Sequence, residues 1–273
     1  MTQTVTPVSE IAPETPTEKQ TEKLTFQQYL VYEGEPDVHY ELVRGKLIPM
    51  PEASHLHMNI TKFLTYKLQL HFATENLELV ANPLATGVRT EEASSRIPDL
   101  VVCRQSIWEE AIQRPGAGVL DFADKPDLVV EIVSTNRRDD YVIKQNEYEV
   151  AEIPEYWIVD PKKKRVRIYS LTSEEGYSWV DFGLGEEISS TQLPNLVLSV
   201  EEILSPPIVE VLIKDKEAQS KQFQQRAEAE QQRAEAERQR AEAERQRAEE
   251  QQQRAERLAQ RLLEMGVNPD EIG

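Results

Sequence analysis

Two short apolar runs share the pentapeptide PDLVV, once within RIPDLVVCRQ (96–105) and again within KPDLVVEIVS (125–134). Valine-rich runs of this length, bounded by proline, are typical of buried β-strands. The second run carries Glu131 at its centre. A carboxylate is costly to bury unless it meets a partner or a metal ion. The two runs therefore predict two core strands, one of which holds an acid that needs a partner.

Strand geometry limits which acid can join Glu131. Asp127 points to the same face of its strand, but four residues at ~3.3 Å each separate the two by about 13 Å, too far to share one ion. If the two runs pair antiparallel, the start of the first meets the end of the second. Asp99 then comes next to Glu131, and Asp127 lies at the far end. We therefore expect Asp99 and Glu131 to form one site.

Two converging carboxylates form a hard-oxygen site, which suits Mg²⁺ or Mn²⁺. Lys144 lies in the helix predicted for YVIKQNEYEVAEI (141–153), which follows the second strand. An ammonium group beside a metal-bound water can orient that water and balance charge on a phosphate. Asp99, Glu131 and Lys144 are therefore the predicted catalytic residues, with Asp99 and Glu131 as metal ligands.

These residues resemble the P-D-(D/E)-x-K nuclease superfamily. Pro98–Asp99 and Glu131 match its pattern, but Val133 stands where the lysine is expected. The run PDLVVEIVS, followed by DDYVIKQNEYEVAEIPEYWIVDP, is similar to the Uma-type (Uma-two) restriction endonuclease family. In that family the lysine is displaced to the following helix, which is the place of Lys144.

The resemblance covers most of residues 24 to 205. It implies a restriction-endonuclease-like fold and metal-dependent hydrolysis of phosphodiester bonds, and it adds Glu41, within YELVRGKL, as a further metal-side carboxylate. His57, at the opening of a helix, is a candidate for contact with the substrate or the metal, with a structural role as the alternative. Arg137, Arg138 and the run KKKRVR (162–167) are the basic clusters of the domain, either solvated or in contact with phosphate.

Element order predicts an α/β or α+β domain of three layers, with a mixed central sheet flanked by helices. Helices are expected in 24–35, from the N-cap Ser54 onward, in 106–113 and in 141–153. Strands are expected in 38–50, turning at Arg44–Gly45, in 78–90, in the two PDLVV runs, and in 155–161, 162–171 and 177–183.

Residues outside this domain have a different composition. Residues 1–23 are polar and rich in Pro and Thr, so we expect them to be disordered; residues 24–212 form the predicted nuclease domain. Residues 213–263 repeat RAEAERQ-like heptads of near-maximal helix propensity, which fits either a solvated charged helix or a weak coiled coil with an alanine seam. This helix is expected to act as a spacer or to join a homodimer or a partner protein, and 264–273 would be a tail.

The net charge of −18 excludes a generic basic nucleic-acid coat protein. It is compatible with an enzyme that contacts nucleic acid locally and uses a divalent metal to neutralise carboxylates. The single cysteine, Cys103, fits a reducing cytoplasm, and no apolar run approaches the ~20 residues of a membrane span, so a cytoplasmic location is expected.

The sequence thus predicts an Mg²⁺- or Mn²⁺-dependent endonuclease that cleaves DNA. The competing hypothesis is a catalytically inactive scaffold that keeps the nuclease fold and recruits partners through its C-terminal helix. Divalent-metal binding that depends on Asp99 and Glu131 distinguishes the two.

Overall fold

The computed structural model describes residues 23–36, 38–84, 86–134, 137–172 and 176–266. The segment expected to be disordered therefore lies outside the described residues except for Lys23, and the predicted tail is described only over 264–266. The chain divides into two compact units, residues 1–209 and 210–273.

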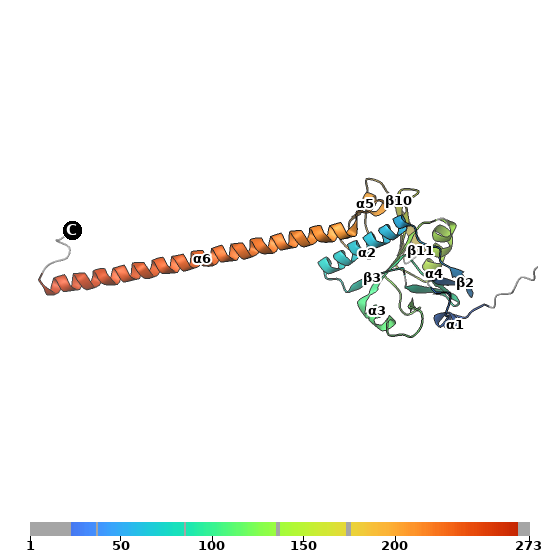
Figure 1. Ribbon diagram of the computed structural model, residues 1–273, viewed down its shortest axis with the longest axis horizontal. Helices are drawn as coiled ribbons and strands as arrows, with labels where there is room; N and C mark the ends of the chain where they lie inside the picture. Colours follow the sequence, from blue (N-terminus) through green and yellow to red (C-terminus); the bar gives the residue numbers. More distant parts are fainter. Residues whose placement is uncertain (1–22, 37, 85, 135–136, 173–175, 267–273) are drawn as a thin grey trace, which may run out of the picture. The chain divides into compact units, whose positions relative to one another are not determined.

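A six-stranded mixed sheet forms the centre of the first unit (Figure 1). Its strands run in the order β11 (Gly176–Gly183), β10 (Arg165–Thr172), β9 (Glu155–Asp160), β8 (Leu128–Ile132), β6 (Leu100–Arg104) and β3 (Leu79–Pro83). The β8–β9 pair is parallel and the other neighbours are antiparallel. The predicted mixed sheet is confirmed, and both PDLVV runs are neighbouring strands within it.

A second sheet of five strands was not predicted. Its order is β2 (Lys46–Pro49), β1 (Tyr40–Val43), β5 (Ser94–Arg96), β4 (Gly87–Glu91) and β7 (Val119–Leu120). The β1–β2 hairpin turns at Arg44 and Gly45, both with positive φ, as expected. The strands β4 (GVRTE) and β5 (SSR) are short and largely polar, and β7 has only two residues, so none of them has the apolar run that marks a core strand. A small pair of strands, β12 (Glu187–Ile188) and β13 (Leu198–Ser199), completes the unit.

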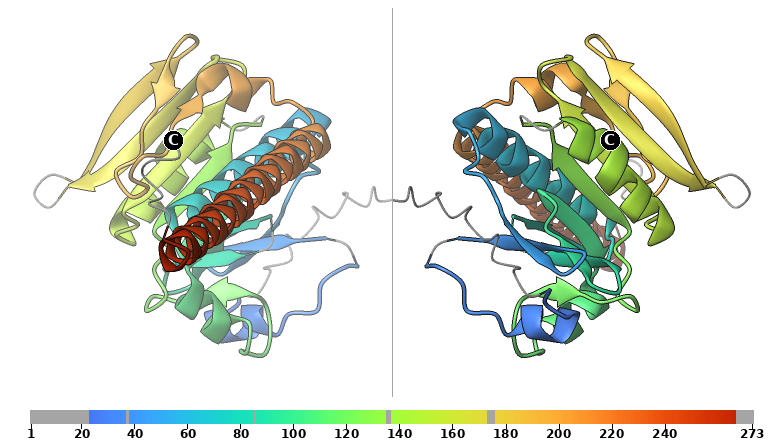
Figure 2. Two further views of the ribbon diagram at one scale, coloured as in Figure 1. Left: turned by 90° about the vertical axis from the view of Figure 1, so that its left-hand side faces the viewer. Right: turned by 90° about the vertical axis from the view of Figure 1, so that its right-hand side faces the viewer.

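Helices cover both faces of the six-stranded sheet (Figure 2). On one face lie α2 (His55–Glu75), capped by the Ser54 hydroxyl as expected, and α5 (Val200–Leu204). On the other face, η1 (Asp139–Lys144) is a turn of π-helix that continues into α4 (Gln145–Val150). The remaining helices are α1 (Phe26–Leu30) and α3 (Gln105–Ala111). These layers give the mixed α/β architecture that the sequence predicts.

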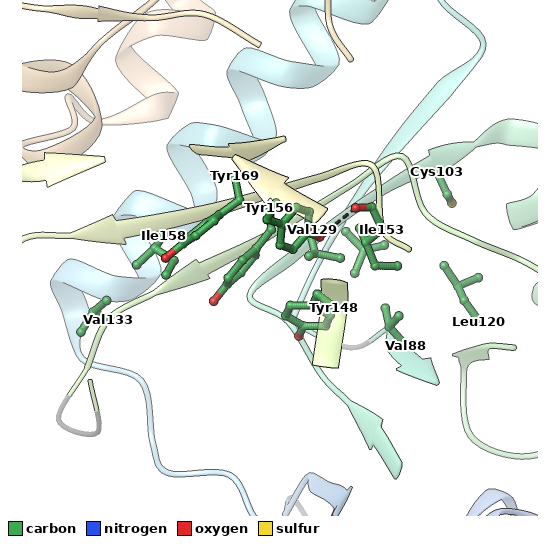
Figure 3. Close-up of a cluster of buried hydrophobic side chains, with 12 residues drawn as sticks. Val88, Cys103, Leu120, Val129, Val133, Tyr148, Ile153, Tyr156, Ile158 and Tyr169 are labelled. Carbon is green, nitrogen blue, oxygen red and sulfur yellow. Dashed lines mark hydrogen bonds between the residues drawn. The ribbon is translucent and has the colours of Figure 1, made fainter. Parts of the chain in front are cut away.

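Tyrosines stack across the face of the sheet that α4 covers (Figure 3). The ring centroids of Tyr148 and Tyr156 are 5.0 Å apart, and those of Tyr156 and Tyr169 are 5.6 Å apart in a stacked arrangement. Burying such large rings contributes strongly to stability, and each aromatic pair adds about 0.5–1.5 kcal/mol. The core on this face consists of Val88, Val101, Cys103, Leu120, Val129, Val133, Tyr148, Ile153, Tyr156, Ile158, Tyr169 and Tyr177.

In the described part of the second unit, residues 210–266, the chain forms the helix α6, which begins at Val209 and ends at Glu264. Its 56 residues correspond to a length of about 84 Å at ~1.5 Å per residue. It begins four residues before the predicted position 213 and ends one residue after the predicted 263. Its side chains beyond Val209 are almost all exposed, as its Glu, Arg and Gln content requires. None of the helices among the described residues could cross a membrane.

Candidate active site

The two PDLVV strands pair antiparallel. In their register Leu100 faces Val130 and Val101 faces Val129. Continuing this register by one residue places Asp99 opposite Glu131, while Asp127 lies at the far end, where its N–H donates to the Val102 carbonyl at 2.8 Å. The arrangement expected from the repeat is therefore the one the structure has.

Asp99 is buried between the beginning of α2 and the end of β8. Its Oδ2 accepts a hydrogen bond of 2.6 Å from the Ile132 N–H, and its Oδ1 lies 2.6 Å from His57 Nε2. The His57 backbone is itself fixed, because its N–H donates to the Ser54 hydroxyl at 3.2 Å. The N-cap of α2 thus fixes the position of a histidine that contacts Asp99.

Glu131 and Lys144 form a buried ion pair, with 2.9 Å between Lys144 Nζ and Glu131 Oε1. Tyr148, one helical turn after Lys144, donates its hydroxyl to the same oxygen at 2.8 Å. Burial raises the pKa of Glu131 well above its usual value, an effect that Lys144 opposes and the Asp99 charge increases. Burial disfavours the charged form of Lys144, yet Glu131 and Glu41 raise its pKa, so the amine remains protonated. The Glu131 carboxylate and the Lys144 amine are therefore in contact and buried from solvent.

Glu41 reaches the same lysine from strand β1, with Oε1 3.4 Å from Lys144 Nζ. Its Oε1 also accepts a 3.1 Å hydrogen bond from the Ile97 N–H, and its Oε2 accepts one of 2.9 Å from Arg96. Burial alone would raise the pKa of Glu41, but the charges of Lys144 and Arg96 hold it below its usual value. Both oxygens of Glu41 are therefore engaged by protein groups.

Arg96 and Glu147 are members of this cluster that were not predicted. The Arg96 guanidinium binds Glu147 through two hydrogen bonds of 2.6 and 2.8 Å, in addition to its bond to Glu41. Both side chains are almost fully buried. One sequence signal was available for Glu147, which lies three residues after Lys144 on the same side of the helix, and none was available for Arg96.

Asp140 is a further buried acid at this site, with its Oδ1 3.9 Å from Lys144 Nζ. Burial raises its pKa to about 7, and the charges of Asp139 and Asp99 add to the increase. The structure brings Asp140 into the charge cluster, because η1 places both Asp140 and Lys144 on the buried side.

The cluster contains more acid than base. Five buried carboxylates, from Glu41, Asp99, Glu131, Asp140 and Glu147, face two buried cations, Arg96 and Lys144, which leaves a formal charge of −3 among the buried groups. Glu131 Oε2 accepts no hydrogen bond from the described residues. A divalent cation would compensate this charge, and Asp99 and Glu131 offer the oxygen ligands that Mg²⁺ prefers.

Across the part of the chain that the structure describes, no group of three or more His, Cys, Asp or Glu side chains is arranged to hold a metal ion. A two-carboxylate site is still adequate, because Mg²⁺ usually keeps several waters and takes one or two protein carboxylates. The residues present therefore fit Mg²⁺ or Mn²⁺ as a solvated ion on Asp99 and Glu131.

Arg137 and Arg138 lie outside the carboxylate cluster. Arg137 forms an ion pair with Asp160, at the end of β9, and Arg138 is exposed at the N-terminal end of η1. Neither arginine pairs with Asp99, Glu131 or Asp140 among the described residues. The structure thus brings together Asp99, Glu131, Lys144, Glu41 and His57, and it does not bring the two arginines into that cluster.

Comparisons with known proteins identify the family and a similar fold. The family model described as "Uma2: Putative restriction endonuclease" matches residues 26–201. The crystal structure of "a putative nuclease belonging to DUF820 from Anabaena variabilis ATCC 29413" is similar in fold, with a TM-score of 0.50 and 20% sequence identity. The similarity covers 67% of this chain and 98% of that one. Among curated proteins, none matches this chain. The chain belongs to the Uma2 family, described as putative restriction endonucleases.

Proposed function

We propose that this chain is a metal-dependent endonuclease that hydrolyses phosphodiester bonds in DNA. One observation carries the proposal: a buried lysine amine lies 2.9 Å from Glu131, and the strand register sets Asp99 opposite that same glutamate. A structural ion pair needs one carboxylate per cation, whereas this cluster has a formal charge of −3. Excess acid beside a fixed amine is the arrangement that metal-assisted phosphoryl chemistry needs. Family membership supports the same class of reaction.

Asp99 and Glu131 would hold Mg²⁺ or Mn²⁺, and Glu41 remains a predicted third ligand. When bound, the ion supplies Lewis-acid polarisation of the phosphate and activation of a water. Lys144 would orient the attacking water and balance the charge that develops on the phosphate. Tyr148 fixes the orientation of Glu131 through its hydroxyl. The contact of His57 with Asp99 favours a positioning role for that histidine over direct contact with substrate.

The direct test is cleavage of supercoiled plasmid by the purified full-length chain. We expect nicked and linear products with Mg²⁺ or Mn²⁺ and none with excess EDTA, because the carboxylates cannot polarise a phosphate alone. Gel electrophoresis over time measures the rate. Products that persist unchanged in EDTA would contradict the metal-dependent mechanism.

A nonenzymatic scaffold is the second candidate, favoured by the 56-residue exposed helix α6, which is long enough to recruit partners. Calorimetric titration with Mn²⁺ separates the two functions. For the endonuclease we expect binding by the wild-type chain and roughly tenfold or greater loss of affinity in Asp99→Asn, since a charged ligand is removed. A scaffold would show no Mn²⁺ binding that depends on Asp99.

A further inference from the structure

The ladder of the six-stranded sheet connects Glu131 to a basic surface. Glu131 pairs with Ile158 on β9, Ile158 with Arg167 on β10, and Arg167 with Asp181 on β11. Residues directly opposite one another in a ladder share a face of the sheet. Arg167 therefore lies on the same face as Glu131 and two strands away, about 10 Å at ~4.8 Å per strand.

Tyr141 joins this surface to the helix of the candidate site. It lies three residues before Lys144 in η1, and its hydroxyl donates to Asp160 at 3.0 Å. Three cations lie over its ring: Lys163 Nζ at 5.2 Å, Arg165 Cζ at 5.4 Å and Arg167 Cζ at 5.5 Å from the centroid. The ring thus gathers positive charge next to the proposed catalytic lysine.

The charge of this surface is opposite to that of the whole chain. Seven basic residues (Arg137, Arg138, Lys162, Lys163, Lys164, Arg165 and Arg167) face two carboxylates, Asp160 and Asp181, which leaves a formal charge of +5 in a chain of net charge −18. The side chains of Arg138 and Lys162–Lys164 pair with no carboxylate of the described residues, and all four are exposed. Local positive charge of this kind attracts polyanions even when the whole protein is acidic.

Trp179 adds an exposed aromatic ring to the same surface. It lies on the edge strand β11 opposite Tyr169 and is 58% exposed. The Arg167 guanidinium lies 5.4 Å from its ring centroid, and the Tyr169 ring lies 6.1 Å away. An exposed aromatic ring that packs against Arg167 and Tyr169 offers a stacking surface of the kind that binds nucleobases. We call Tyr141, Trp179 and the seven basic residues the cation–aromatic platform.

We propose that the cation–aromatic platform binds a single-stranded segment of nucleic acid, with phosphates on the lysines and arginines and one base stacked on Trp179. This proposal rests on the proposed function: a nucleic-acid strand bound to the platform would run toward Glu131. Stacking on Trp179 requires a base with a free face, which paired bases within a duplex do not offer. An acidic peptide would match the charge but would give Trp179 no planar partner.

Binding is measured with a fluorescently labelled oligothymidylate, by anisotropy, in EDTA so that no cleavage occurs. We expect Lys162→Glu/Lys163→Glu to weaken binding by roughly tenfold or more and to reduce the salt dependence by about 0.7 per lost phosphate contact. Trp179→Ala should weaken binding by roughly tenfold, whereas Trp179→Phe, which keeps a stacking ring, should bind close to wild type. The matched control is Lys214→Glu/Lys216→Glu, which makes the same charge change on exposed α6 and should bind as wild type.

Tryptophan fluorescence gives a second readout. The oligothymidylate should quench emission from Trp179, and Trp179→Phe should remove this quenching, because Trp157 is fully buried and Trp108 is half-buried against the core, outside the platform. The proposal is overturned if Trp179→Ala binds the oligothymidylate as the wild type does, or if the α6 control loses as much affinity as Lys162→Glu/Lys163→Glu. It is also overturned if polyglutamate of equal charge displaces the oligothymidylate, because charge alone would then explain the binding. Equal binding of a duplex that is insensitive to Trp179 also overturns it.

The outcomes separate this proposal from the endonuclease assignment. If the wild-type chain binds oligothymidylate through Trp179 but cleaves no DNA with Mg²⁺, the platform stands and the proposed function fails. If the wild-type chain cleaves DNA and the platform variants do so with unchanged KM, the proposed function stands and the platform fails.

Discussion

Replacing Glu131 with glutamine is expected to lower metal-dependent DNA cleavage by about a thousandfold or more, since several kcal/mol of transition-state stabilisation depend on the bound ion. Glutamine has nearly the same volume and can still accept the hydrogen bond from Tyr148, and Lys144 keeps Glu41 as a partner, so the fold should be kept. What is lost is the charge that pairs with Lys144 and would hold the metal. The rate of plasmid nicking in Mg²⁺, compared at equal protein concentration, measures the effect.

The repeated pentapeptide supplies a matched control for this variant. Asp127 begins the same strand as Glu131 and occupies the place in PDLVV that Asp99 occupies in the first copy. Its Oδ2 is buried without a hydrogen-bond partner among the described residues, and burial raises its pKa. Asp127→Asn should therefore leave cleavage unchanged. Equal loss of activity in both variants, or full activity in Glu131→Gln, would show that the assignment of the site is wrong.

Arg96→Ala is expected to destabilise the first unit by about 3–5 kcal/mol, the usual cost of removing one partner from a buried charge network. Arg96 is the only cation that joins Glu41 to Glu147 in the described part of the chain, and its side chain is 3% exposed. Without it, Glu147 loses its charged partner and Glu41 keeps only Lys144, so a buried carboxylate must take up a proton or remain uncompensated. Urea unfolding followed by tryptophan fluorescence measures the change, because all three tryptophans belong to residues 1–209 and not to α6.

Arg44→Ala is the corresponding control on the surface. Arg44 contacts Glu91 at 3.5 Å, but 70% of its side chain is exposed, and such pairs contribute about 0–1 kcal/mol. If the urea midpoint of Arg96→Ala shifts no further than that of Arg44→Ala, the stability of the first unit does not depend on the ion pairs of Arg96.

The two facing carboxylates of the candidate site followed from the sequence because strand periodicity is a strict constraint. A one-residue change in register would turn Glu131 to the opposite face, so the pairing of two apolar runs was enough to bring Asp99 to it. Lys144 was placed by family resemblance, because nothing in the periodicity of its helix distinguishes it from a surface lysine. Its role in catalysis stays a prediction.

Arg96, Glu147 and the five-stranded sheet escaped prediction for a different reason. Arg96 belongs to a strand of three residues, SSR, that carries no hydrophobic alternation, and its two partners are 55 and 51 residues away. Contacts of that kind depend on how the second sheet packs on the first. A single sequence contains no local signal for such packing, although the burial of an arginine always requires acidic partners.

The wide turn of η1 changes how the family's motif must be searched for. The π-helical turn itself carries the amine of Lys144, and its wider turn sets the phase of the residues that follow in α4. In this chain the amine is thirteen positions downstream of Glu131, yet the two atoms are in contact. Pattern searches that fix the acid-to-lysine gap at two positions would miss proteins built this way, and a scan that allows the amine to come from a following helix would recover them.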